Sequence, residues 1–200
     1  YYLTWQRCCR NSIIDNIVAP GNAAMAFYTE IPDPFLANST PVFGAYPNAY
    51  FCASILTTQN FTCTDIDGDQ LVYSLVTPLN GNASSLTPIP PISSGPYSDI
   101  TWLAPFNAAD MVGGTPVMSI NATSGILSAA PAILGTYVFA VKVEEFRAGI
   151  KIGEIRRDIQ YQVINCPSNQ APVFTQPATD SSTITLVAGD SICIPVQAVD

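Results

Sequence analysis

Histidine is absent from this chain of 200 residues, and charged residues make up only 11% of it. Without histidine there is no Ser-His or Cys-His pair to activate a nucleophile, and neither a GxSxG motif nor a phosphate-binding glycine loop occurs. We therefore expect no enzymatic activity. The six cysteines form no CxxC pair, which disfavours a zinc site. No apolar run reaches the length of a membrane-spanning helix, so we expect no membrane span in this segment.

The charge that is present is acidic and spread along the chain. Asp and Glu number 15 against 7 Lys and Arg, a formal net charge of −8. Such a chain repels phosphate backbones, so nucleic acid is not an expected partner. Low charge, 17 prolines and scattered cysteines are typical of an extracellular protein in an oxidising setting. The alternative is a cytosolic protein with buried free thiols.

An internal repeat organises the chain. NSTPVF at residues 38–43 returns as NQAPVF at residues 169–174, and each copy precedes a strand-like run with a cysteine and then a T-C-T-D or Q-A-V-D sequence. One unit therefore spans about 130 residues. We predict that residues 1–39 are the last strands of a preceding β-domain, 40–166 a complete domain, and 167–200 a linker with the first strands of the next. The chain begins in the strand-like YYLTW and ends on Asp200, so we expect a fragment of a longer repeat protein.

Short strands separated by turns make up the middle unit. QLVYSLV (70–76), TYVFAVKVEEF (136–146) and EIRRDIQYQVINC (154–166) alternate between apolar and polar residues. Turn sequences rich in Gly, Pro, Asn and Asp lie between them. This pattern predicts an all-β protein of tandem antiparallel β-sandwiches.

The most specific local motif is D-I-D-G-D at residues 65–69. Asp65, Asp67 and Asp69 alternate around Gly68, which permits a tight turn, and such a loop can wrap oxygen ligands around a calcium ion. A further ligand would come from Glu144 or Glu145, and our hypothesis for the set is Asp65, Asp67, Asp69 and Glu145. The alternative is an acidic β-turn whose aspartates cap their own backbone.

Several stretches together resemble a known class of repeats. QRCCRNSIIDNI, DIDGDQLVYSLVTP, the NATSGILSAAP and GTYVFAVKVEEFRAG segments, and RRDIQYQVINC are similar to repeats of very large surface proteins of Bacteroidota. Those proteins are secreted by the type IX route and are associated with gliding motility, adhesion and surface filaments. SGILSAAP with the strand that follows it also resembles bacterial cadherin-like repeats, and NQAPVF resembles a cadherin linker. Cys166, Pro167 and Ser168 stand where cadherins carry acidic ligands, which disfavours calcium between domains.

The resemblance implies a structural role at the cell surface. We expect a stalk or filament segment of an extracellular adhesin with immunoglobulin-like or cadherin-like domains. Its partners would be neighbouring domains of the same chain, other copies in a homo-oligomeric fibre, and surface glycans or another cell. The alternative is a carbohydrate-binding module of a secreted polysaccharide-degrading protein. An exposed aromatic row would favour the module, whereas burial of Trp5, Trp102, Tyr97 and Tyr46 would favour the stalk.

The cysteine positions suggest bridges between successive domains. Cys166 closes the last strand of the middle domain and Cys193 lies in an early strand of the next; Cys8 or Cys9 stands in the same relation to Cys52. We therefore predict the bridges Cys166–Cys193 and Cys9–Cys52. Adjacent strand residues point to opposite faces, so Cys8 and Cys9 are not expected to bond to each other. The alternative keeps bridges within a domain, for example Cys52–Cys63 or Cys52–Cys166.

Overall fold

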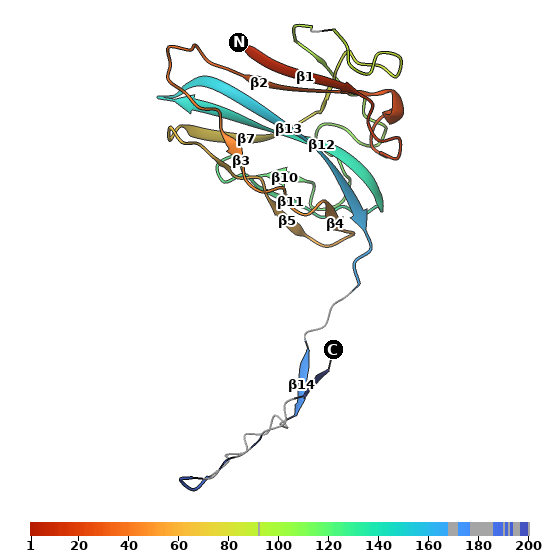
Figure 1. Cartoon of the computed structure of the whole chain (residues 1–200). Helices are drawn as coiled ribbons and strands as arrows, with labels where there is room; N and C mark the ends of the chain where they lie inside the picture. The colour runs from red at the N-terminus through yellow and green to blue at the C-terminus, as the bar shows by residue number, and fades with distance from the viewer. Residues whose placement is uncertain are drawn as a thin grey trace. The chain divides into compact units, whose positions relative to one another are not determined.

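The computed structural model describes residues 1–91, 93–167, 172–176, 186–189, 191, 193 and 197–199. It divides into two compact units, Tyr1–Asn165 and Cys166–Asp200 (Figure 1). Within the described residues the only regular helix is one 3₁₀ turn, η1 (Pro20–Asn22), and no helix there is long and apolar enough to cross a membrane. The predicted all-β, largely antiparallel architecture is confirmed.

The larger sheet of the first unit has six strands. They follow the order β1-β2-β13-β12-β7, and β4 pairs in parallel with the end of β13. Their bounds are β1 (Tyr2–Cys8), β2 (Ala24–Glu30), β4 (Tyr50–Cys52), β7 (Gln70–Val76), β12 (Gly135–Arg147) and β13 (Ile150–Ile164). The long β12–β13 hairpin turns at Ala148 and Gly149, whose φ angles are 51° and 78°. Positive φ at both positions is what a two-residue turn with the right twist requires.

Smaller strands complete the unit. A second sheet has the antiparallel order β10-β11-β5, and two further antiparallel pairs join β3 to β6 and β8 to β9. Their bounds are β3 (Val42–Phe43), β5 (Thr57–Asn60), β6 (Cys63–Thr64), β8 (Leu79–Asn80), β9 (Ser98–Asp99), β10 (Ser119–Ile120) and β11 (Ile126–Ala129).

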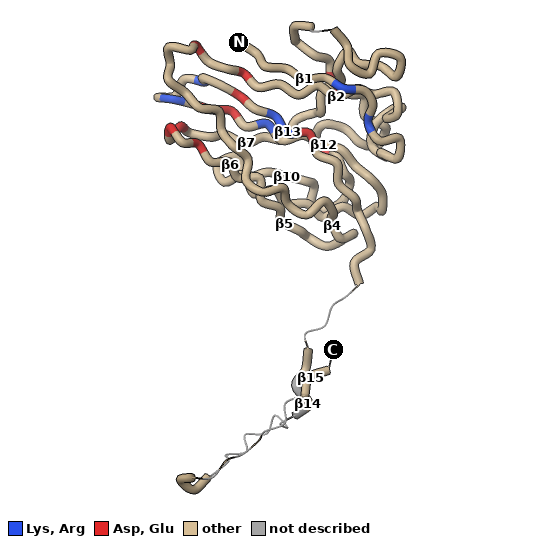
Figure 2. Tube along the Cα trace, in the orientation of Figure 1, with Lys and Arg blue, Asp and Glu red and all other residues tan. Residues whose placement is uncertain are grey.

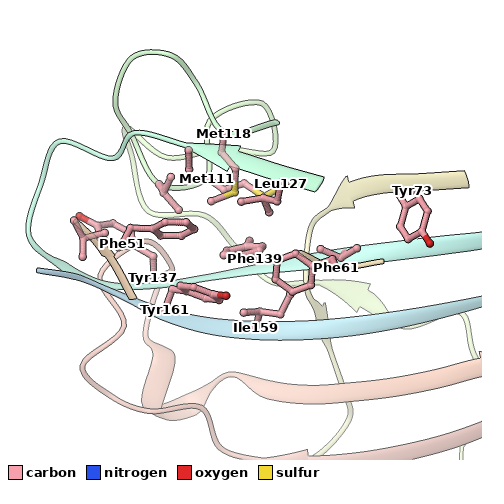
Figure 3. Packing of buried hydrophobic residues seen from close by; sticks show 14 of the residues in the cluster. Phe51, Phe61, Tyr73, Met111, Met118, Leu127, Tyr137, Phe139, Ile159 and Tyr161 are labelled. Atoms are coloured by element: carbon pink, nitrogen blue, oxygen red, sulfur yellow. The ribbon is translucent and has the colours of Figure 1, made fainter. Parts of the chain in front are cut away.

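The main hydrophobic core lies between the two sheets. Alternate residues of β12 and β13, such as Phe139 and Tyr161, face Leu127 of β11 and Phe61, and all four are almost fully buried (Figure 3). Phe139 packs against Tyr161 with ring centroids 5.5 Å apart, and Phe61 meets Phe139 edge-on. The period-two pattern seen in the sequence thus places one face of the hairpin in a close-packed interior.

The N-terminal residues belong to this same unit, which corrects the predicted boundary at residue 39. β1 and β2 extend the larger sheet through Glu30 and Thr29, which pair with β13. The segment between them covers the other face of β12, where Val138 is buried against Ile14 and Ile17. β12 needs this cover because its residues on both faces are apolar over residues 137–141 and all of them are buried.

Two polar side chains fix that segment in place. Asn16 is fully buried, donates to the carbonyls of Met111 and Val138, and accepts the N–H of Val138. Arg10 is buried in an ion pair of 2.7 Å with Asp158, and it also donates to the carbonyls of Ala24 and Leu79. Residues 1–39 are therefore part of the core structure of the domain that was predicted to begin at residue 40.

The second unit repeats a strand pair of the first. β14 (Val173–Gln176) runs antiparallel to β15 (Gln197–Val199), with Val173 opposite Val199. In the first unit Val42 lies opposite Thr64 in the same antiparallel way. Val173 and Val199 are the positions that the sequence repeat aligns with Val42 and Thr64. Residues 168–171 of the predicted linker and the Phe174 side chain lie outside the described residues.

The cysteines differ from the predicted scheme. Cys8 is bonded to Cys9, so the Cys9–Cys52 bridge does not form. Because β1 ends at Cys8, Cys9 is no longer a strand residue, and the alternation of side chains along a strand does not keep the two cysteines apart. Cys52 lies on β4, which pairs with β13, whereas β1 is separated from β13 by β2. Cys193 is an exposed free thiol, so the Cys166–Cys193 bridge does not form either. Cys52 and Cys166 are both disulfide-bonded, and Cys63 is a buried free thiol.

Candidate cation site

The D-I-D-G-D loop joins β6 to β7 and lies beside the C-terminal end of β12. Leu71, two residues after the loop, pairs with Glu145, and Gln70 pairs with Phe146. This register brings the loop carboxylates to Glu145. Carboxylate oxygens of Asp65, Asp69 and Glu145 all lie within 4.8 Å of one another. The structure therefore groups three of the four residues named from the sequence.

Asp67 faces elsewhere. Its carboxylate accepts the backbone N–H of Ser39 at 2.6 Å and does not belong to the cluster. Its backbone N–H donates to Asp65 Oδ1 at 3.0 Å, as does that of Asp69 at the same distance. The acidic-turn interpretation thus holds for one oxygen of Asp65, while its other oxygen, Oδ2, is buried without a hydrogen-bond partner.

Glu145 is the most unusual member of the cluster. It is fully buried because the alternation along β12 turns it toward the interior, and neither carboxylate oxygen has a hydrogen-bond partner. Gly153 lies opposite it on β13, and a Cβ there would stand 2.9 Å from Glu145 Oε2. Burial raises the pKa of Glu145 to about 7, and the nearby Asp65 carboxylate adds to the effect. A buried carboxylate without donors needs a proton or a cation.

Arg147 balances one of the three carboxylates. Its guanidinium forms a bidentate ion pair with Asp69, with Nε–Oδ1 at 2.7 Å and Nη2–Oδ2 at 2.5 Å. This contact lowers the pKa of Asp69. Arg147 Nη2 also donates to Asn38 Oδ1 at 2.6 Å, while Asn38 Nδ2 is buried without a partner. When all three carboxylates are ionised, two negative charges remain, which matches a divalent cation.

These groups suit a hard cation bound through oxygen. Glu145 offers two free oxygens and Asp65 offers one, and carboxylate oxygens are the ligands that calcium prefers. Asp69 contributes less, because both of its oxygens accept bonds from Arg147. In the absence of a cation, a proton on Glu145 would neutralise one of these two negative charges. The sequence did not reveal Asn38, Arg147 or Gly153 as parts of this site, since strand pairing and the contact of Arg147 with the NSTPVF segment bring them there.

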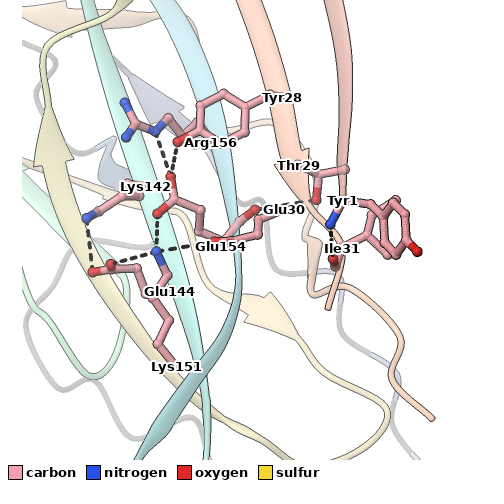
Figure 4. Close-up of polar contacts among 10 residues, drawn as sticks. All are labelled: Tyr1, Tyr28, Thr29, Glu30, Ile31, Lys142, Glu144, Lys151, Glu154 and Arg156. Atoms are coloured by element: carbon pink, nitrogen blue, oxygen red, sulfur yellow. Dashed lines mark hydrogen bonds and ion pairs between the residues drawn. The ribbon is translucent and has the colours of Figure 1, made fainter. Parts of the chain in front are cut away.

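A second charged group lies on the outer face of the hairpin. Lys151 Nζ is 2.5 Å from Glu154, 3.4 Å from Glu30 and 3.4 Å from Glu144, and Tyr28 also donates to Glu154 (Figure 4). Glu144, the other residue considered for calcium, thus belongs to this group. Burial alone would raise the pKa of Glu154, but the bonds from Lys151 and Tyr28 outweigh it and lower that pKa to about 2.

The charged side chains are concentrated on one part of the unit. Charged residues lie mainly along β12, β13 and the segments beside them, whereas the layer of β5 and β10 carries almost none (Figure 2). In the candidate cation site Glu145 is fully buried, whereas the adjacent Glu144 pairs with Lys151 of the charged group.

The aromatic residues considered for sugar binding do not form one row. Trp5 is 56% exposed and packs on Phe27, while Tyr46 is 51% exposed below Arg157. Trp102 is half-buried at the core, and Tyr97 is half-buried in a separate pocket. No protein-family model, curated protein or solved structure matches this chain.

Proposed function

We propose that this chain is a tension-transmitting segment of an extracellular stalk or filament, built from immunoglobulin-like or cadherin-like sandwiches in series. The observation that carries the proposal is the repeated register, in which Val42 opposite Thr64 recurs as Val173 opposite Val199. A strand pair that returns with its sequence supports a second copy of the part of the domain that begins at Asn38 in the first unit. A surface adhesin of the Bacteroidota type, exported by type IX secretion, is the setting that the sequence resemblance favours.

The strand directions of the first unit suit this role. β1 is antiparallel to β2 and β2 to β13, so β1 and β13 run in the same direction. Force applied at Tyr1 and Asn165 therefore acts along the strands from opposite ends. Under such shear several ladder hydrogen bonds must break together, whereas strands peeled apart lose them one at a time. At its end β13 also pairs with β4, and Ala53 N–H donates to the Ile164 carbonyl at 2.8 Å.

A bound calcium ion would strengthen the same unit beside the NSTPVF segment. Asn38 opens the repeated NxxPVF sequence and is bonded to Arg147, which holds Asp69. A cation between Asp65 and Glu145 would join the β6–β7 loop to β12 beside this contact. We propose calcium as the ion, because the ligands are carboxylate oxygens, which calcium accepts in varied geometries.

Single-molecule force spectroscopy tests the proposal. The full chain is pulled through residues 1 and 200, and Ala53→Pro is compared with wild type, since proline removes the N–H that holds Ile164. The matched control is Leu36→Pro, which removes a turn bond of 2.8 Å to Asp33 that lies off the strand path.

We expect a distinct unfolding peak for the first unit and a lower peak force in Ala53→Pro than in Leu36→Pro. Chemical denaturation measures the global stability of each variant, so that the two are compared at known stability. A wild-type unit that extends without a resolved force peak would contradict the proposed mechanical role.

A further inference from the structure

A pocket of about 610 Å³ is lined by residues that do not belong to the candidate cation site. Its walls include Tyr2 and Thr4 of β1, Tyr28 of β2, Arg156 of β13, and Ser93 and Tyr97 of the segment before β9. Pockets of about 300–1,000 Å³ hold small organic ligands. Neither the tension-transmitting role nor the cation site uses these residues.

Hydrogen bonds hold the wall of the pocket in place. Gln6 is buried under it and donates from Nε2 to Ser93 Oγ at 2.9 Å, and Asn82 Nδ2 donates to the same oxygen at 2.9 Å. Tyr97 donates its hydroxyl hydrogen to the Ser93 carbonyl at 2.7 Å. The Pro88 carbonyl accepts the N–H of Cys8 at 3.0 Å. The pocket is therefore preformed, which reduces the entropy lost when a ligand binds.

The chemistry of the lining combines aromatic rings with one cation. The rings of Tyr2 and Tyr28 meet edge-on at 5.8 Å, and the Arg156 guanidinium lies 5.1 Å from the centre of the Tyr28 ring. Arg156 uses Nε to bond Glu154 at 3.1 Å (Figure 4). No described residue accepts a hydrogen bond from its two terminal nitrogens. Those two nitrogens form an edge of the guanidinium group that can bind a carboxylate in bidentate geometry.

We propose that this pocket binds a sugar ring that carries a carboxylate, such as a hexuronic acid unit of a glycan. Tyrosine rings provide apolar walls for the C–H face of a pyranose, Ser93, Ser94 and Thr4 surround it with hydroxyl groups, and Arg156 pairs with the carboxylate. Arg156 is the one cation in the lining and Glu154 lies beside it, so a singly charged carboxylate fits better than a phosphate-rich ligand.

Binding is tested on the full chain by ¹H–¹⁵N NMR titration with D-glucuronate. D-glucose has the same ring without the carboxylate, and acetate has the carboxylate without the ring. We expect saturable shifts of pocket residues with glucuronate, at least about tenfold weaker binding of glucose, and the same for acetate, because each lacks one of the two contacts.

Variants assign the binding to the pocket. Tyr2→Ala should weaken glucuronate binding about tenfold, and it is safe for folding because Tyr2 is 66% exposed. Arg156→Gln should weaken it at least as much. The matched controls are Trp5→Ala and Arg7→Gln, exposed residues of β1 outside the pocket, which should bind as wild type does.

Three results would overturn the proposal: no saturable glucuronate binding, equal binding of acetate, or unchanged binding in Tyr2→Ala. Each of them leaves the force measurements unaffected, so failure of the sugar site is distinguishable from failure of the proposed stalk function.

Discussion

At the scale of single residues, the neighbouring carboxylates decide whether Glu145 is protonated or binds a cation. Its two oxygens are buried without partners, and Asp65 and Asp69 add negative charge beside them. Three carboxylates, one of them fully buried, against one arginine favour any species that brings positive charge, either a proton or a divalent cation. The two cases differ in what calcium does to the stability of the fold.

Calcium should raise the melting temperature of the wild-type chain relative to EDTA, by roughly 5–10 °C at about 100 times the Kd. In Glu145→Gln this rise should disappear, because the variant lacks the buried anionic ligand. Glu144→Gln is the matched control: it neutralises the adjacent carboxylate on the opposite face and should keep the calcium response. Differential scanning calorimetry provides the measurement. Equal calcium responses in the two variants would contradict the proposed site.

Glu154 predicts an acid-dependent loss of stability. Its pKa is about 2 in the folded chain against an ordinary 4.5, so its contribution is fully present above about pH 4.5 and is lost as the pH falls toward 2. We expect a contribution of about 2 kcal/mol, since Lys151 is partly exposed and solvent screens the pair. Urea unfolding of wild type and Glu154→Gln between pH 2 and about 6 measures it. The two stability curves should converge at the acid end; a constant offset would refute the assignment.

At the scale of elements, the segment between β1 and β2 acts as the cover of β12. Asn16 supplies three hydrogen bonds to buried backbone groups there. Asn16→Ala should therefore cost about 3 kcal/mol, because it leaves those groups unpaired in the interior. Asn11→Ala, in the exposed part of the same segment, should change stability by less than about 0.5 kcal/mol. Denaturant unfolding of both variants checks the difference, and equal effects would show that the segment does not stabilise the sheet.

At the scale of the whole molecule, the first unit needs its N-terminal residues to fold. Removal of residues 1–39 would take away β1 and β2 and expose Val138 and Ile100 of the second cluster. We expect a chain of residues 40–200 to show no cooperative thermal transition, whereas residues 1–167 melt as the first unit does in the full chain. Circular dichroism during heating distinguishes the two cases. A cooperative 40–200 chain would restore the boundary predicted from the repeat.

The sequence by itself determined the local structure of the central strands. Alternating residues predicted strands at 70–76, 136–146 and 154–166, and the structure has β7 at Gln70–Val76, β12 at Gly135–Arg147 and β13 at Ile150–Ile164. Alternation and turn residues are local properties, and for that reason they can be recognised along the chain. The D-I-D-G-D loop before β7 was recognisable for the same reason, and so was the repeated NxxPVF sequence, although its place in a strand pair was not predicted.

Only the tertiary structure decided what these elements contact. Strand register set Glu145 opposite Gly153 and beside Asp65, while Asp67 turned away to Ser39. Pairing of β2 with β13 joined residues 1–39 to the domain, although the repeat alone placed them outside it. The end of β1 at Cys8 allowed the Cys8–Cys9 bond that alternation argued against. Each of these outcomes depends on contacts between distant residues, and a single sequence specifies such contacts only through the folded chain.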